Sequence, residues 1–205
     1  MGVSLPYGVM MIVVKAVLTA LLLALTLAPP QARANPHVWV EARVTFEFRD
    51  HRVTGLTFVW RFDDYYSSHT IRSHDRNGDG VFTRPEMRAL RADTFDPLVG
   101  SDYHVHVWAE GGKRVGHEID RFTARIEEKR LVIEFSLPVT PPADPSKDPV
   151  SVSLFDPKNA VDFGFAPSGF LGVMGGLNPS CKFRVARGKG EQSGHPRPVT
   201  LRCGG

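Results

Sequence analysis

One short stretch of the chain carries the ligand pattern of a calcium-binding loop. Residues 75–86 read DRNGDGVFTRPE and match the D-x-N-x-D-G-x5-E pattern of the EF-hand loop. In such a loop, oxygens at positions one, three, five, seven, nine and twelve surround one Ca²⁺ ion. The corresponding residues are Asp75, Asn77, Asp79, Val81 (through its carbonyl), Thr83 and Glu86. The sequence therefore predicts a calcium site at this loop.

The remaining positions of the loop fit the same interpretation. Gly80 at position six permits the sharp turn, and the apolar Phe82 at position eight suits packing against the protein. A simpler alternative is a plain turn and a capping box, in which Thr83 and Glu86 serve only the following helix. Arg76 and Arg84 reduce the local negative charge, and the sequence has no second loop of this type. We therefore expect weak affinity and a structural calcium clip rather than a sensor.

Three histidines are candidate ligands for a transition metal. His104 and His106 are two residues apart in an expected strand, so they share a face, and His37 stands at the start of another. Imidazole nitrogens are suitable ligands for zinc, nickel or copper. The three histidines can meet only if the first strand and the strand at 103–108 are neighbours in one sheet. The alternative is that His104 and His106 are solvated residues on the wet face of their strand.

Composition and motifs weigh against several other classes of function. The chain has 205 residues, of which 42% are hydrophobic and 23% charged, so it is too apolar for a disordered protein. A formal net charge of +3 gives little reason to expect a nucleic-acid partner. The sequence contains no nucleophile elbow, zinc-protease motif or phosphate-binding loop. We therefore expect that the protein is not an enzyme.

The first 34 residues have the pattern of a secretory signal peptide. Lys15 precedes a leucine-rich apolar run over 16–28, and Ala32-Arg33-Ala34 matches an A-x-A cleavage site. The run is short for a membrane span, which needs about 20 apolar residues. Removal of residues 1–34 would leave a periplasmic protein with no stable membrane insertion. An uncleaved N-terminal anchor is the alternative interpretation.

Two cysteines, Cys181 and Cys203, remain after this cleavage. In an oxidising compartment two cysteines usually pair, so we expect a disulfide between them. A loop of this size contributes about 3 kcal/mol to stability in the entropy model. The alternative is a pair of thiolate metal ligands, but the spacing matches no zinc motif.

Most of the mature chain alternates between apolar and polar residues, as half-buried strands do. The expected strands are 38–48, 56–62, 103–108, 115–126, 131–137, 150–154, 161–165 and 181–185. Several short strands separated by turn signals predict a mainly β protein with an antiparallel β-sandwich. A proline-rich connection at 139–149 and a glycine-rich loop at 167–179 would join some of these strands.

One segment breaks the β pattern. Residues 63–97 lack the period of two, and 87–92 are good helix formers. This predicts a helical, EF-hand-like excursion between strands two and three. The sandwich domain would then span residues 35–187, and residues 188–205 would form a polar, loop-like tail.

The mature chain up to about Val185 resembles an uncharacterised family of bacterial periplasmic proteins. The resemblance lies in PHVWV at 36–40, WRFDDYYS at 60–67, the loop at 75–86, FDP at 155–157 and VDF at 161–163. That family is known as the periplasmic component of an ABC-type transport system, and its genes often lie beside nickel/cobalt transporter genes. Its members usually begin with His-Pro-His, whereas Asn35 replaces the first histidine here.

Taken with the motifs, this resemblance implies a periplasmic calcium-binding protein that is an accessory or metal-binding component of a transition-metal transport system. The expected cofactors are Ca²⁺ and one of Ni²⁺, Co²⁺ or Zn²⁺, and the expected partner is an inner-membrane metal transporter. The alternative is a calcium-stabilised extracytoplasmic β-sandwich that acts as a binding or scaffold module with no transition-metal role.

Overall fold

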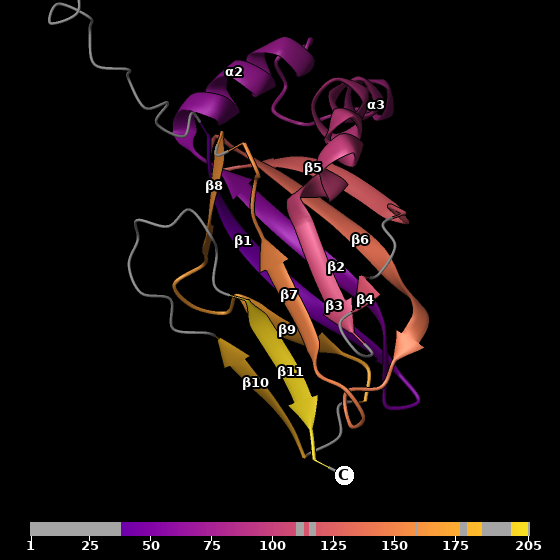
Figure 1. Ribbon diagram of the computed structural model, residues 1–205. Helices are drawn as coiled ribbons and strands as arrows, with labels where there is room; N and C mark the ends of the chain where they lie inside the picture. Colours follow the sequence, from indigo (N-terminus) through magenta and orange to yellow (C-terminus); the bar gives the residue numbers. More distant parts are fainter. Residues whose placement is uncertain are drawn as a thin grey trace, which may run out of the picture. The chain divides into compact units, whose positions relative to one another are not determined.

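The computed structural model describes residues 38–109, 113–114, 118–158, 160–176, 180–185 and 198–204. These residues belong to one unit, Ala34–Gly205, and form two β-sheets and a helical segment (Figure 1). The mainly β prediction is therefore confirmed.

The first sheet contains the strands with the longest alternation. They are β1 (Val38–Arg49), β2 (Arg52–Phe62), β5 (Arg121–Glu127), β6 (Arg130–Ala143), β8 (Val161–Phe165) and β9 (Leu171–Met174). The spatial order is β5-β6-β2-β1-β8, and β9 pairs with the part of β1 that follows its pairing with β8. Every second residue of β1 from Val40 to Phe48 is buried, which is why this strand has one apolar face.

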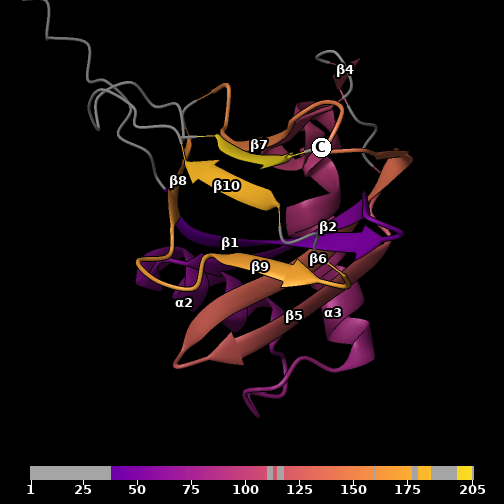
Figure 2. The same ribbon diagram turned by 90° about the horizontal axis from the view of Figure 1, so that it is seen from below.

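The second sheet lies against the first, and Figure 2 shows the two layers from below. Its strands are β3 (Val105–Ala109), β4 (Lys113–Arg114), β7 (Val150–Leu154), β10 (Cys181–Val185) and β11 (Val199–Cys203). The order is β10-β11-β7-β3-β4, and each pairing is antiparallel.

The structure corrects the expected strand pattern in several places, and residues 118–120 of the expected strand at 115–126 lie before the start of β5. The sandwich is not purely antiparallel, because β8 and β9 run parallel to β1. The expected connection 139–149 begins inside β6, the expected loop 167–179 contains β9, and the expected tail 188–205 contains β11. Strands β9 and β11 are too short for their alternation to stand out in the sequence. They are strands because their backbones pair with neighbouring strands, β9 with β1 and β11 with β7 and β10.

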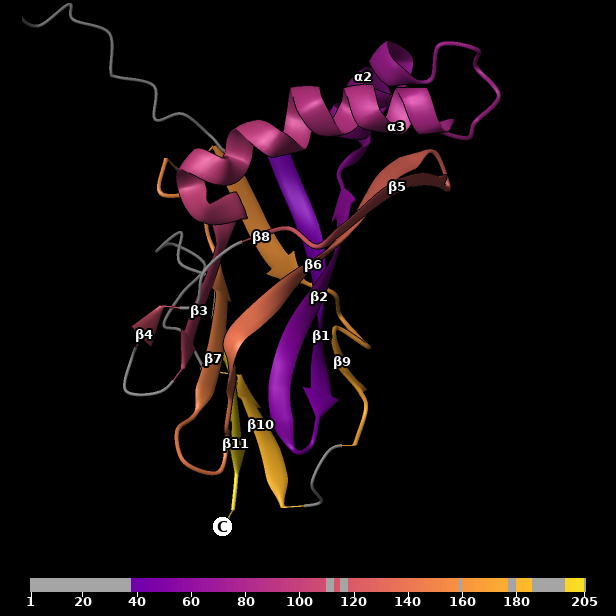
Figure 3. The same cartoon turned by 90° about the vertical axis from the view of Figure 1, so that its right-hand side faces the viewer.

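The helical segment lies between β2 and β3, where the sequence breaks its β pattern, and it extends to residue 104 rather than 97. It contains α2 (Asp64–His74), α3 (Arg84–Leu90), a π-helical turn η1 (Arg91–Phe95) and the 3₁₀ segment η2 (Asp96–His104). Figure 3 shows α2 and α3 across one end of the sandwich, opposite the end where β10 and β11 lie. Among the described residues, none of the helices has the length and apolar content needed to cross a membrane.

Aromatic rings join the helical segment to the core. The ring of Trp60 on β2 packs against Phe95 of η1, Phe135 of β6 and Phe163 of β8, with centroids 6.1, 4.8 and 5.1 Å apart. Fully burying one such side chain stabilises a fold by about 1.5–3 kcal/mol. Phe95 therefore holds the end of the helical segment against the first sheet.

Candidate functional site

Helix α2, which leads into the predicted calcium loop, is capped by Asp63. One carboxylate oxygen of Asp63 accepts a hydrogen bond from the backbone N–H of Tyr66 at 2.8 Å. The other oxygen accepts from the backbone N–H of Trp39 on β1 at 2.7 Å. One side chain thus satisfies the helix start and ties it to the first sheet.

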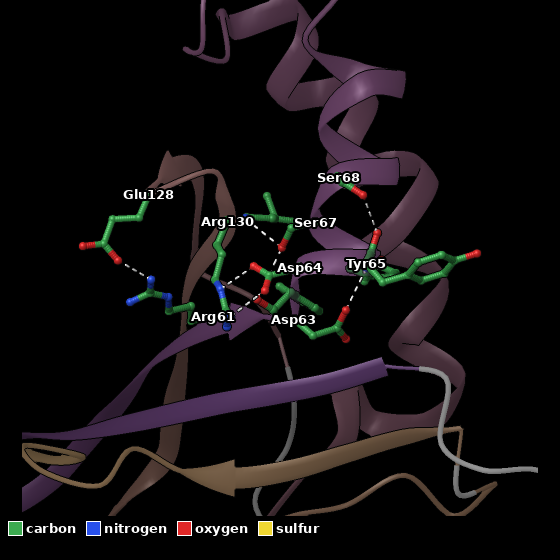
Figure 4. A network of polar contacts seen from close by, with 11 residues as sticks. Arg61, Asp63, Asp64, Tyr65, Ser67, Ser68, Glu128 and Arg130 are labelled. Atoms are coloured by element: carbon green, nitrogen blue, oxygen red, sulfur yellow. Dashed lines mark hydrogen bonds and ion pairs between the residues drawn. The ribbon is translucent and has the colours of Figure 1, made fainter.

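A buried serine provides the second attachment of α2. The Ser67 hydroxyl donates to the Phe62 carbonyl at 3.3 Å and accepts from the Leu131 N–H of β6 at 3.0 Å. At the surface, the Arg130 guanidinium forms an ion pair with Asp64, and Figure 4 shows this pair next to Ser67. These contacts fix the direction in which α2 presents the loop that follows it.

Residues 75–83 connect α2 to α3, and two glycines in this connection have a left-handed backbone conformation. Gly78 and Gly80, at loop positions four and six, have φ of +70° and +81°. Glycine adopts this region readily because it has no Cβ. Phe82 at position eight is buried in the core, as predicted. The loop thus has a helix on each side and a glycine at each of the two positions with a left-handed backbone conformation.

The side chains of the first half of the loop are held against its own backbone. Asp75 accepts from the N–H groups of Gly78 and Gly80 at 2.9 and 3.0 Å. Asp79 accepts from the N–H of Val81 at 2.9 Å and from the Asn77 amide at 2.8 Å. Three of the predicted ligand side chains are therefore already ordered by the loop.

Glu86 closes the loop from the other side. Its Oε1 accepts from the Arg76 N–H at 2.8 Å, and its Oε2 accepts from the N–H and the hydroxyl of Thr83 at 2.9 and 2.8 Å. Hydrogen bonds from Thr83 and then from Arg76 lower the pKa of Glu86 below its ordinary value. Glu86 therefore stays ionised at neutral pH while it links loop position two to position nine.

Thr83 and Glu86 also form a complete capping box at the start of α3. The capping interpretation of these two residues is confirmed, and their role as calcium ligands stays a prediction. Within the ranges that the structure describes, no three His, Cys, Asp or Glu side chains are grouped as a metal site.

The structure does not meet the condition set for the three-histidine site, which is that the two strands are neighbours in one sheet. Strand β1 belongs to the first sheet, whereas β3 belongs to the second and pairs with β7 and β4. The helical segment between β2 and β3 carries the chain from one sheet to the other. His37 lies outside the described residues, so its position relative to His104 and His106 stays untested.

His104 and His106 do not lie on a solvated strand face. They are 5% and 6% exposed, and His104 ends η2 with a φ of +54° instead of belonging to β3. The ring of His106 stacks on Phe155 with centroids 3.8 Å apart, while the ring of His104 lies 5.8 Å from Phe163. The left-handed backbone conformation of His104 breaks the strand alternation on which the prediction depended.

A buried carboxylate that the motif search did not single out lies beside His104. Nδ1 of His104 and Oδ1 of Asp156 are 3.8 Å apart, and the two side chains are 6% and 4% exposed. The backbone N–H groups of Lys158, Ala160 and Val161 donate to Asp156 at 2.9, 2.9 and 3.1 Å. The sequence signal for this residue was only its place in the family motif FDP.

The charges of this pair follow from burial and hydrogen bonding. Burial by itself raises the pKa of Asp156, but the three backbone donors and His104 outweigh it, so the net shift is downward. Burial lowers the pKa of His104, and the nearby Asp156 offsets this only in part. At neutral pH the pair is therefore an ionised carboxylate beside a neutral imidazole.

The two cysteines of the chain are joined by a disulfide, as predicted. Cys181 and Cys203 are directly opposite residues of β10 and β11. The bond therefore ties the last strand of the chain to the edge of the second sheet.

Comparison with known proteins identifies a family and no activity. An "Uncharacterized 15.5 kDa protein in trpE 3'region" of Spirochaeta aurantia is 28% identical over 131 residues, which cover 63% of this chain and 93% of that protein. Residues 20–201 match the family described as "Protein of unknown function (DUF1007)". Because that match spans most of the sequence, the chain belongs to the DUF1007 family.

Proposed function

We propose that this protein binds calcium in the loop at 75–86 and acts outside the cytoplasm as an accessory or metal-binding component of a transition-metal transport system. The observation that carries the calcium proposal is the agreement between side-chain spacing and backbone conformation. Five of the six ligand positions fall in the connection between α2 and α3, and the sixth, Glu86, lies in the first turn of α3. Left-handed glycines stand at loop positions four and six.

The chemistry of the candidate ligand atoms supports calcium rather than a softer metal. All six candidate ligands present oxygen, and Asp75, Asp79 and Glu86 bring negative charge. Calcium takes about six to eight oxygen ligands, including a bidentate glutamate at position twelve. Bound calcium would offset two of the three negative charges, which otherwise rely on hydrogen bonds from the loop itself. Because only the folded loop brings these ligands together, binding would stabilise the folded protein.

Thermal unfolding with and without calcium tests this proposal. Binding to the folded state alone adds about 2.7 kcal/mol at a ligand concentration of 100 Kd. Millimolar calcium should therefore raise the Tm, and Glu86→Gln should abolish the rise. Glutamine still supports a capping box, so this variant separates the calcium role of Glu86 from its capping role. An unchanged rise in Glu86→Gln, or an equal rise with magnesium, would contradict the proposal.

The transport part of the proposal is supported by the resemblance to periplasmic proteins encoded beside nickel/cobalt transporters. The alternative is a calcium-stabilised binding or scaffold module with no transition-metal role. One observation favours this alternative: β1 and β3 lie in different sheets, so strand pairing does not assemble the predicted three-histidine site.

Elemental analysis of the protein purified from the periplasm distinguishes the two functions. The transport proposal predicts a bound transition metal in addition to calcium, and this metal should persist in competition with excess calcium. Calcium alone, with no retention of added zinc, nickel or cobalt, would favour the scaffold module.

A further inference from the structure

We propose that His104 and Asp156 are two ligands of a transition-metal site, located where η2 leads into β3 and where β7 leads toward β8. This inference rests on the metal-binding part of the proposed function and names the residues that perform it. The site shares no residue with the loop at 75–86.

The first argument is the distance between the two side chains. Nδ1 of His104 and Oδ1 of Asp156 are 3.8 Å apart, which is too long for a hydrogen bond. Nδ1 of His104 is buried and has no hydrogen-bond partner in the described part of the chain. Consider two ligand atoms that each lie about 2.1 Å from one zinc-like ion. They are about 3.4 Å apart when the ligand–metal–ligand angle is tetrahedral, and about 4.2 Å apart when they lie on opposite sides of the ion. One ion between the two atoms would therefore match the separation.

The second argument is the charge. Asp156 is an ionised carboxylate that is almost fully buried, and its three hydrogen bonds come from neutral backbone N–H groups. The side chain paired with it, as far as the described residues show, is His104, whose Nδ1 lies 3.8 Å away and donates no hydrogen bond to it. A buried charge without a compensating partner is costly. A divalent cation bound to both side chains would supply the missing positive charge.

The third argument is that the surrounding backbone holds both side chains in place. Asp102, Tyr103 and His104 are consecutive non-glycine residues with φ of +51°, +51° and +54°. Non-glycine residues in this region are strained, and such residues cluster at ligand sites. The Tyr103 ring stacks on Phe95, and the Phe155 N–H donates to the His104 carbonyl at 3.0 Å. The two ligand segments are thus bonded directly to each other.

The ligand chemistry selects the class of metal. An imidazole nitrogen with a carboxylate oxygen suits zinc, nickel or cobalt, whereas calcium prefers oxygen alone. The site also adjoins the start of β1, because Val161 pairs with Val38 and Val161 donates to Asp156. His37 directly precedes Val38 in the sequence, and its predicted role as a ligand lies outside the described residues.

The test is a metal titration of the untagged mature protein in saturating calcium. Cobalt binding is followed by visible absorption, and zinc binding by equilibrium dialysis. The wild type should bind one equivalent, and His104→Asn and Asp156→Asn should each bind at least about tenfold more weakly. The matched control is His51→Asn, which removes an exposed histidine that also has a positive φ, of +61°. Asparagine tolerates this backbone region, so the control should bind like the wild type.

Two results would overturn the inference. One is a wild-type protein that binds neither cobalt nor zinc, and the other is wild-type affinity in both variants with circular dichroism showing them folded. If the variants do not fold, NMR of the wild type decides, since zinc must shift the ring signals of His104 more than those of His51. The calcium-dependent rise in Tm is measured on the same samples. Its presence or absence reports on the calcium proposal separately from the His104–Asp156 site.

Discussion

Two carboxylates stand out at the level of single residues because three donors converge on each. Glu86 accepts from one N–H of Arg76 and from the N–H and hydroxyl of Thr83. Asp156 accepts from the backbone N–H groups of Lys158, Ala160 and Val161. These donors lower both pKa values, so both groups carry negative charge at neutral pH inside or beside the folded core. Each of them is therefore an anionic group that a cation can bind.

The loop at 75–86 also depends on backbone conformations that only glycine adopts easily. Gly80 has a φ of +81°, and a Cβ at this position would meet no heavy atom within 4 Å. We predict that Gly80→Ala lowers the free energy of unfolding by about 1–2 kcal/mol, because a left-handed alanine is strained. It should also weaken calcium binding. Urea unfolding and calcium titration measure the two effects.

Gly100→Ala is the matched control for this prediction. A Cβ at Gly100 also has open space around it, and its φ is outside the left-handed region. Its substitution should change stability by no more than about 0.5 kcal/mol. Equal losses in the two variants would show that backbone strain at Gly80 is not the cause.

At the level of elements, the attachment of α2 to the first sheet decides how the loop is presented. The Ser67 hydroxyl is fully buried and provides the acceptor for the Leu131 N–H of β6. We predict that Ser67→Ala lowers the free energy of unfolding by about 1–3 kcal/mol, because it leaves a buried N–H group without an acceptor. Chemical denaturation monitored by tryptophan fluorescence measures this loss.

The neighbouring Ser68 provides the control on the same helix. Its hydroxyl is exposed and donates to the Tyr65 carbonyl within α2. Ser68→Ala should change stability by no more than about 0.5 kcal/mol. If Ser67→Ala were as mild as Ser68→Ala, the bond to β6 would not be an important attachment.

At the level of the whole molecule, the disulfide fastens the C-terminal strand to the sandwich. Val199 and Leu201 of β11 are fully buried, and Cys203 of the same strand is bonded to Cys181 on the edge strand β10. The cysteines are 22 residues apart. We predict that the double variant Cys181→Ala/Cys203→Ala is destabilised by about 3 kcal/mol, mainly because its unfolded chain is less constrained.

A reductant provides the control for the disulfide prediction. It should lower the stability of the wild type toward that of the double variant and leave the double variant unchanged. An equal effect on both proteins would mean that the reductant acts elsewhere, and the predicted contribution of the bond would be wrong.

The sequence by itself determined the features that depend on neighbouring residues. The alternation of β1, β2 and β6 predicted half-buried strands because side chains in a strand point to alternate faces. The Asp63 cap and the Thr83–Glu86 capping box were also predictable, since their partners lie within three residues along the chain. The ligand spacing of the loop is likewise local, and so is the requirement for glycine at its turns.

Only the tertiary structure decided the features that depend on distant partners. Strand β9 has only four residues and β11 only five, and each is a strand because a neighbour offers its backbone groups for pairing. The parallel course of β8 along β1 and the division of strands between two sheets depend on the path of the connections. His104 meets Asp156 for the same reason: η2 and the end of β7 are brought together when β3 pairs with β7. No local pattern encodes such a meeting, because its free energy comes from contacts between segments that are far apart in the chain.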